Sequence, residues 1–208
     1  MAEAPQSEQP QIYLITPPEP DLVTFPDQLA RVLDGAEIAC LRLSLATRDE
    51  DRLMRAANAL RDVAHRYDVA MVIDTHVVLA ERLGLDGVHL MGPRGVRAAR
   101  QELGADTIVG AFCDTSSHDG MSAGEAGADY IAFGPVTGAN LGDGSLADYE
   151  LFEWWSQMIE LPVVAEGGLT EDTVRSLTPV TDFFGIGEEI WGHEDPLTAL
   201  KALQGAMV

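Results

Sequence analysis

The chain has little cysteine and almost no lysine. Among its 208 residues, Cys40 and Cys113 are the two cysteines, and Lys201 is the single lysine. Two cysteines without the spacing of metal ligands exclude a disulfide scaffold and are typical of a reducing compartment. No apolar run approaches the roughly 20 residues that a membrane-spanning helix needs. The first ten residues, MAEAPQSEQP, lack the basic and apolar segments of a secretory signal. We therefore expect a cytoplasmic protein with a disordered tail over residues 1–10.

Positive charge is scarce as well. The chain carries 34 acidic and 13 basic residues, a formal net charge of −21, and residues 101–174 contain no lysine or arginine. Nucleic acids and anionic membranes bind basic surfaces, so neither is an expected partner, and we expect a small-molecule substrate instead. The hydrophobic fraction of 46% and charged fraction of 23% are those of a globular protein. The length fits one domain over residues 11–208.

Eight short apolar segments recur along the chain, and each has the continuous apolar pattern of a strand covered on both faces. They span residues 11–16, 37–45, 69–74, 87–90, 107–112, 129–134, 162–167 and 182–187. Patterns of helical period lie between them. Thr47 and Glu50 have the spacing of a capping box, Thr170 is a candidate N-cap, and Asp195-Pro196 is typical of a helix start.

Eight strands that alternate with helices over about 200 residues predict a single (β/α)8 barrel, an α/β fold. Alternation alone also fits an open, doubly wound sheet. In a barrel the active site lies on the loops that follow the carboxyl ends of the strands. The candidate functional residues are therefore those that end each apolar segment.

Several segments have the order and spacing of a known family. They are IYLIT (12–16), DGVHL (86–90), GADYIAFGPV (127–136) and PVVAEGGL (162–169), followed by a glycine-rich eighth strand. In these motifs the chain resembles thiamine phosphate synthase and the related TenI-type thiazole tautomerases. The resemblance covers residues 11–192. It implies a TIM barrel transferase that joins a pyrimidine methyl diphosphate to a thiazole phosphate and releases pyrophosphate with the help of Mg2+.

The family's charged positions are mostly replaced in this chain. Where the second strand of the family has Gln-x-Arg-x-Lys, residues 40–44 read CLRLS and keep only Arg42. Where the third strand has Asn-Asp-Arg with a Mg2+-binding aspartate, residues 74–76 read DTH, which leaves Asp74 as the candidate metal ligand one position earlier. Arg94 stands in place of a second metal-binding aspartate. The Pro-Thr-x-Thr-Lys loop of the family corresponds to residues 137–142, which contain no lysine.

The resemblance and the strand ends together give a set of predicted site residues. Backbone N–H groups in the glycine loops after strands seven and eight are typical phosphate ligands, whereas the carboxylates of Glu188 and Glu189 beside them would repel a phosphate dianion. Glu166 ends strand seven, where it could project into the barrel mouth. The predicted substrate-binding residues are Arg42, Asp74, Thr75, Thr137, Glu166, Gly167, Gly168 and Gly187.

His76 and His118 are the candidate catalytic residues, because each lies at or after a strand end and histidine transfers protons near neutral pH. Asp74, His76 and Asp114 could also converge on a metal ion. His89, within a strand, is interpreted as a hydrogen-bonded interior residue.

Three functions stay open on this sequence. The first is a thiamine-phosphate-synthase-like transferase. The second is a TenI-like tautomerase that handles a thiazole phosphate without diphosphate chemistry. The third is a binding protein that has kept the barrel and lost the diphosphate and Mg2+ site. The apolar segment of residues 151–159, with Trp154 and Trp155, predicts a helix that packs on the barrel and could also form a homodimer contact.

Overall fold

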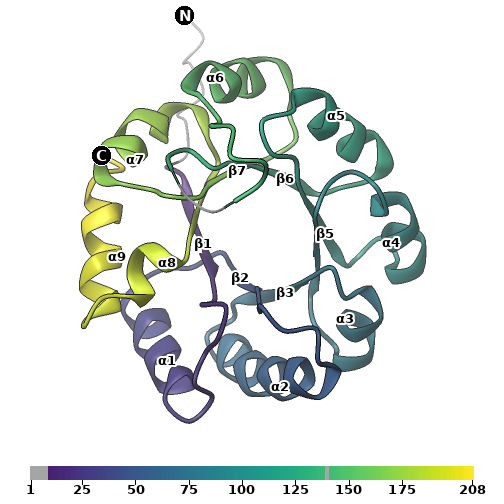
Figure 1. Ribbon diagram of the computed structural model, residues 1–208, viewed down its shortest axis with the longest axis vertical. Coiled ribbons are helices and arrows are strands. Elements are labelled where there is room, and N and C mark those ends of the chain that lie inside the picture. The colour runs from purple at the N-terminus through teal and green to yellow at the C-terminus, as the bar shows by residue number, and fades with distance from the viewer. Residues whose placement is uncertain (1–8, 139–140) are drawn as a thin grey trace, which may run out of the picture.

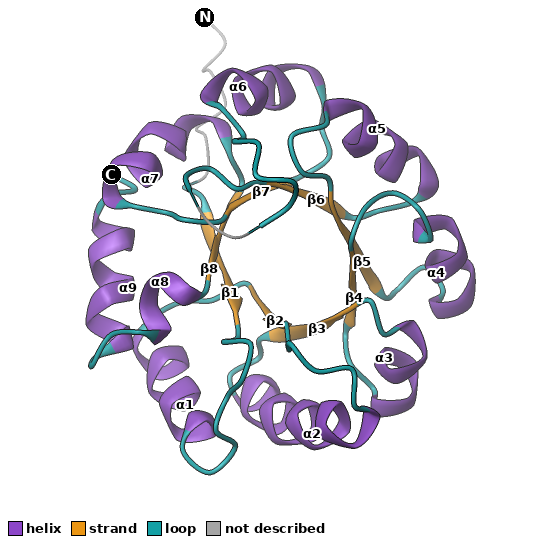
Figure 2. Ribbon diagram, viewed as in Figure 1, coloured by secondary structure: helices purple, strands orange, loops and turns teal. Residues whose placement is uncertain are grey.

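The computed structural model describes residues 9–138 and 141–208, which form a closed barrel of eight parallel strands inside a ring of helices (Figures 1 and 2). Each strand pairs with the next one along the chain, and β8 closes the barrel against β1. The predicted (β/α)8 barrel is confirmed, and the open doubly wound sheet is wrong. The strands are β1 Gln11–Ile15, β2 Cys40–Leu43, β3 Ala70–Asp74, β4 Gly87–Leu90, β5 Ile108–Phe112, β6 Tyr130–Phe133, β7 Val163–Glu166 and β8 Phe183–Ile186.

Helices follow the strands and cover the outside of the barrel (Figure 2). Their bounds are α1 Phe25–Gly35, α2 Glu50–Arg66, α3 Val77–Leu83, α4 Val96–Leu103, α5 Ser117–Ala126, α6 Tyr149–Met158, α7 Glu171–Leu177, α8 Glu188–Trp191 and α9 Pro196–Gly205. A short 3-10 turn, Thr178–Val180, precedes β8. The short α8 lies beside α9 and extends the loop that leaves β8.

Two of the three predicted helix starts are confirmed and one is wrong. Thr170 caps α7 by accepting a hydrogen bond from the Thr173 N–H, and Asp195 caps α9. The capping box of Thr47 and Glu50 does not form. Asp49 is the N-cap of α2 and accepts from the Arg52 N–H, while the Thr47 hydroxyl accepts from the Asp49 N–H. The Asp49 carboxylate is the stronger acceptor and lies two residues closer to the helix than Thr47.

Alternate residues of each strand point into the barrel, because successive side chains of a strand point to opposite faces of the sheet. The apolar part of this interior comprises Tyr13, Cys40, Val72, Phe112, Tyr130, Ala132 and Val164. The other strand face joins the larger core against the helices. Arg42, His89 and Glu166 also point inward. Arg42 pairs with the interior residue Val72, and His89 pairs with Asp74, two residues after Val72. Glu166 is two residues after the interior residue Val164. Charged side chains therefore occupy the barrel interior below its carboxyl-end mouth.

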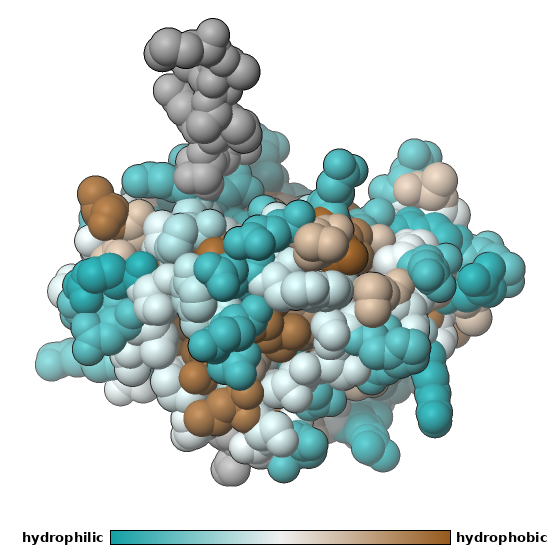
Figure 3. Space-filling view, turned by 90° about the horizontal axis from the view of Figure 1, so that it is seen from above, coloured by the Kyte–Doolittle hydropathy of each residue, from teal (hydrophilic) through white to brown (hydrophobic). Residues whose placement is uncertain are grey.

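The amphipathic segment of residues 151–159 largely forms α6, as predicted. Phe152 and Trp155 are fully buried against the barrel, whereas Trp154 is 40% and Met158 65% exposed. On the side where Figure 1 draws α6, hydrophilic residues surround separate apolar groups (Figure 3). Packing on the barrel is thus confirmed, and the homodimer contact stays a prediction.

The predicted tail of residues 1–10 lies outside the described residues, apart from Gln9 and Pro10. Within the described ranges, no helix is both long and apolar enough to cross a bilayer.

The absence of a side chain at Gly110 makes room for the Tyr130 ring inside the barrel. A Cβ atom at Gly110 would overlap that ring, whereas one at Gly205, at the end of α9, would meet nothing within 4 Å. Overpacking of a filled core costs about 1–3 kcal/mol. We expect Gly110→Ala to lower the free energy of unfolding by that amount in urea titrations. Gly205→Ala, the matched control, should change it by less than about 0.5 kcal/mol, and equal effects would contradict this packing.

Candidate active site at the carboxyl ends of the strands

Arg42 on β2 is the centre of a charged cluster inside the barrel. Its guanidinium lies 2.8 Å (Nη2) from Oε2 of Glu166 on β7 and 3.6 Å (Nε) from Oδ1 of Asp74 on β3. Arg42 is 6% and Glu166 1% exposed. Burial lowers the pKa of Arg42, but the Glu166 and Asp74 carboxylates more than offset this and raise it above its ordinary value. Arg42 is therefore a permanent buried cation held between two strands.

Glu166 is only partly neutralised by this cation. Burial raises the pKa of its carboxyl group, and the adjacent Arg42 guanidinium lowers it, with a net rise. Oε2 of Glu166 faces Arg42 Nη2, whereas Oε1 has no partner among the described residues. Because Arg42 stays charged at 2.8 Å, we assign the ionised carboxylate to Glu166 at neutral pH. One buried oxygen, Oε1, thus retains the capacity to accept a hydrogen bond.

A chain of hydrogen bonds runs from Arg42 through the barrel interior. Arg42 Nη1 donates to His89 Nε2 at 2.8 Å, because a guanidinium has no acceptor. His89 is therefore the Nδ1–H tautomer, and Nδ1 donates to the Tyr130 hydroxyl at 2.9 Å. The Tyr130 and Tyr13 hydroxyls are 2.5 Å apart. The prediction that His89 is a hydrogen-bonded interior residue is confirmed.

One of the cavities at the carboxyl ends of the strands, the central cavity, opens above Arg42. Its volume is about 280 Å3, and Thr16, Arg42, Ser44, Glu166, Gly168 and Glu189 are among its lining residues. Gly167 and Gly187 also line it. Five of the predicted binding residues therefore meet here, from β2, β7 and the loop after β8. Thr137 contributes indirectly, because its hydroxyl donates to the Gly168 carbonyl at 2.5 Å and holds the loop after β7. Positions 139–140 of the predicted Thr137–Gly142 loop lie outside the described residues.

Three backbone N–H groups converge beside this cavity, and we call them the amide cup. The N–H groups of Gly168 and Leu169 donate to Oε1 of Glu189 at 3.0 and 3.1 Å, and the Gly187 N–H donates to Oε2 at 2.8 Å. Gly168 has φ +75°, a conformation that glycine adopts without strain. The predicted backbone donors are thus present, and a carboxylate of the chain itself accepts their hydrogen bonds.

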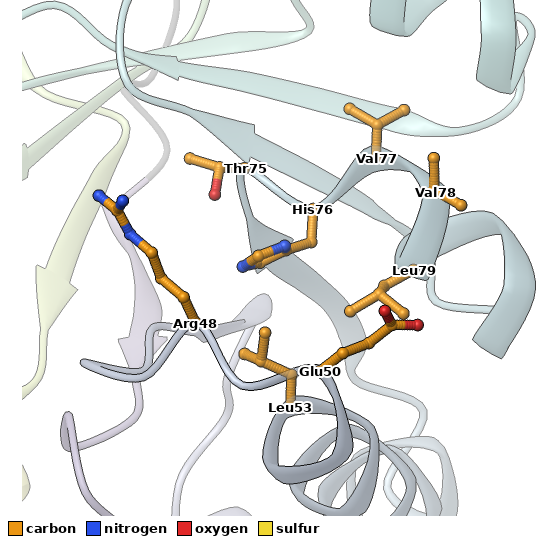
Figure 4. Close-up of a pocket in the computed structure, with 8 residues that line it drawn as sticks. All are labelled: Arg48, Glu50, Leu53, Thr75, His76, Val77, Val78 and Leu79. Atoms are coloured by element: carbon orange, nitrogen blue, oxygen red, sulfur yellow. The ribbon is translucent and has the colours of Figure 1, made fainter.

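Another cavity, the peripheral cavity, contains the predicted residues of the loop after β3. Its volume is about 380 Å3, and Thr75, His76 and Arg48 line it together with the start of α2 (Figure 4). The His76 ring points into the space between the two loops, and the Arg48 side chain extends toward Thr75 (Figure 4). Arg48 is exposed, and among the described residues no carboxylate lies within ion-pair distance of it. Arg48 and His76 therefore offer an anion a cationic side chain and a hydrogen-bond donor.

The structure does not gather the remaining candidates. His118 is exposed in the first turn of α5 and lines neither cavity. The predicted metal set of Asp74, His76 and Asp114 is wrong, because no group of three or more His, Cys, Asp or Glu residues in the described ranges could hold a metal ion. Asp74 faces Arg42 instead. Asp74, His76 and Asp114 therefore do not form a three-residue site for the Mg2+ that the family resemblance implies.

Two features of the site were not predicted from the sequence. They are the role of Arg48, and the contact of Glu189 with the amide cup. Arg48 follows β2 by a few residues, but its loop carries no family motif that would have marked it. Glu189 was identified as a carboxylate near the phosphate loops, yet the contact of its side chain with two loops depends on tertiary structure. Tyr13 and Tyr130 lie in apolar strand segments, and nothing in the sequence marks them as part of a hydrogen-bond chain. Burial raises the pKa of both far above the ordinary value.

Fold and site together define a class of protein: a single (β/α)8 barrel with a small-molecule site on its strand-end loops. Residues 12–181 match the family model described as thiamine monophosphate synthase. The chain is 40% identical over 186 residues to the thiamine-phosphate synthase of Rhodospirillum centenum, covering 88% of this chain and 89% of that one. It is 38% identical over 200 residues to that of Hyphomonas neptunium, covering 92% and 90%.

The chain belongs to the thiamine monophosphate synthase family, as the sequence motifs predicted. A solved structure of the same fold is the thiamine phosphate pyrophosphorylase of Pyrococcus furiosus, with a TM-score of 0.82 and 23% identity, covering 95% of each chain.

The Arg42–Glu166 pair gives a test of stability. Removing one partner of a buried ion pair costs about 3–5 kcal/mol, because it leaves the other charge unpaired. We expect Arg42→Met to lose that much unfolding free energy, and addition of Glu166→Gln to recover at least about 1 kcal/mol of it. Arg175→Met, which breaks an exposed pair with Asp172, should cost less than about 1 kcal/mol. Additive effects of Arg42→Met and Glu166→Gln in urea titrations would contradict the coupling.

His89 gives a test of pH dependence. Burial and the Arg42 guanidinium lower the pKa of His89 well below 6.5. The folded state therefore keeps His89 neutral, and its contribution to stability is present above pH 6.5 and is lost as the pH falls toward the folded pKa. The loss is about 1.4 kcal/mol per pH unit. His89→Gln retains an acceptor for Arg42 and a donor for Tyr130 but cannot titrate. We expect its stability to fall less steeply than wild type between pH 6.5 and 5, and equal slopes would show that His89 is not responsible.

Proposed function

We propose that the chain catalyses the thiamine-phosphate-synthase reaction, in which a pyrimidine methyl diphosphate and a thiazole phosphate are joined and pyrophosphate is released. The observation that carries the proposal is the 40% identity to a thiamine-phosphate synthase over 88% of this chain. The cavities at the strand ends support it, because the loops there must hold two substrates.

The peripheral cavity is our candidate site for the diphosphate. When the carbon–oxygen bond to the diphosphate breaks, negative charge develops on the leaving oxygen, and nearby cations stabilise it. Arg48 and His76 are directed into this cavity. Arg42 is held deeper by Glu166 and Asp74. Arg48 thus takes the role that a lysine of strand two has in the family pattern.

The central cavity is our candidate site for the thiazole half. Gly167 and Gly168 line it with accessible backbone, and Thr137 fixes their loop through the Gly168 carbonyl. We route no step through Mg2+, because the described residues do not assemble a site for it.

The test of this function is turnover by the purified protein. Pyrimidine methyl diphosphate and thiazole phosphate are incubated with the protein and Mg2+, and thiamine phosphate is measured by chromatography beside a family member of known activity. We expect product formation that requires both substrates. Absence of product, while the reference enzyme turns over in the same buffer, would overturn the proposal.

Arg48→Ala tests the assignment of the diphosphate site. Loss of one charge-stabilising group typically lowers the rate by about 10²–10³. We expect a fall of about 10² in kcat/KM with the pyrimidine substrate varied. Arg48 is exposed, so folding should be retained. Arg175→Ala, which removes an exposed arginine on α7, should leave kcat/KM unchanged. An Arg48→Ala enzyme as active as wild type would exclude Arg48 from the site.

A further inference from the structure

The carboxylate of Glu189 occupies the position that the amide cup offers to an anion. Both of its oxygens accept hydrogen bonds, and the three donors come from two separate loops, after β7 and after β8. Successive N–H groups that converge in this way form a concave anion site. A phosphate at the same donors would displace the Glu189 oxygens, since each N–H donates to one acceptor at these distances.

The same cavity contains a second feature that points to a ligand. Glu166 is 1% exposed and lines the central cavity, and its Oε1 atom has no partner in the described structure. Such oxygens are costly to bury unless something donates to them. The cavity is therefore built to receive a molecule with hydrogen-bond donors. Its other carboxylates, Glu188 and Glu189, oppose the approach of a dianion.

We propose that Glu189 is a specificity-determining residue, because its carboxylate competes with the phosphate of a ligand for the amide cup. A phosphate ester gains the three N–H groups only after the Glu189 side chain leaves them. An uncharged analogue, such as the thiazole alcohol, does not face this competition. Glu189 thus reduces the advantage of a phosphate ester over its alcohol. The choice of thiazole ligands rests on the proposed function; the competition itself does not.

Calorimetric titration with inorganic phosphate tests the competition without turnover. Removal of an internal competitor that accepts three hydrogen bonds should strengthen phosphate binding at least about tenfold. We expect this gain in Glu189→Ala relative to wild type. The matched control is Glu194→Ala, which removes the same charge from an exposed residue that lines neither cavity and should bind phosphate within about threefold of wild type. Thiazole alcohol should bind wild type and Glu189→Ala equally well.

Two outcomes would overturn the proposal. One is phosphate affinity of Glu189→Ala within about threefold of wild type. The other is an equal gain in Glu194→Ala, which would indicate a general charge effect. If Glu189→Ala does not fold, Glu189→Gln retains the length of the side chain with one acceptor oxygen, and we expect it also to bind phosphate more tightly than wild type. A wild-type dissociation constant already below about 0.1 mM would overturn the proposal without any variant.

The outcome of the phosphate titration does not depend on the outcome of the turnover assay. A protein without synthase turnover can still show the gain in phosphate affinity, and an active synthase can fail to show it.

Discussion

The ion pair of Arg42 and Glu166 is the interaction on which the rest of the site depends. It joins β2 to β7 across the barrel interior, where neither charge is solvated. Arg42 in turn fixes the tautomer of His89, and His89 orients Tyr130. Buried charges are costly when unpaired, so the strands that supply them must close in one register. The same ion pair therefore fixes the register in which the barrel closes and places charged groups at its mouth.

This arrangement also explains why the retained arginine does not act as the family pattern suggests. In this chain Arg42 faces two carboxylates, so much of its charge is already compensated inside the protein. Arg48, in the loop after β2, is exposed, and no carboxylate pairs with it among the described residues, so it is available to an incoming anion. At the amide cup the chain likewise compensates its own polar groups, because the Glu189 carboxylate accepts hydrogen bonds from N–H groups that a ligand could otherwise use. In both places the chain supplies its own counter-ion.

The sequence was sufficient for the fold because the barrel depends on short-range patterns. Apolar strands, caps such as Thr170 and Asp195, and family motifs all indicate the same architecture. It also placed Arg42, Glu166 and the glycine loops at strand ends, where the structure brings them together. The partners of those residues could not be predicted. The contacts of Arg42 with Glu166, and of Glu189 with Gly168, join segments 124 and 21 residues apart, and only the closed barrel determines them.

The uneven distribution of cations along the chain has a consequence for the approach of a substrate. Arg48 comes from the β2 side of the mouth, while Glu188 and Glu189 come from the β8 side, beyond the stretch without lysine or arginine. The mouth therefore carries a transverse electric field. A molecule with one anionic and one neutral end has its lowest electrostatic energy in a single orientation, so the field aligns it before any contact forms.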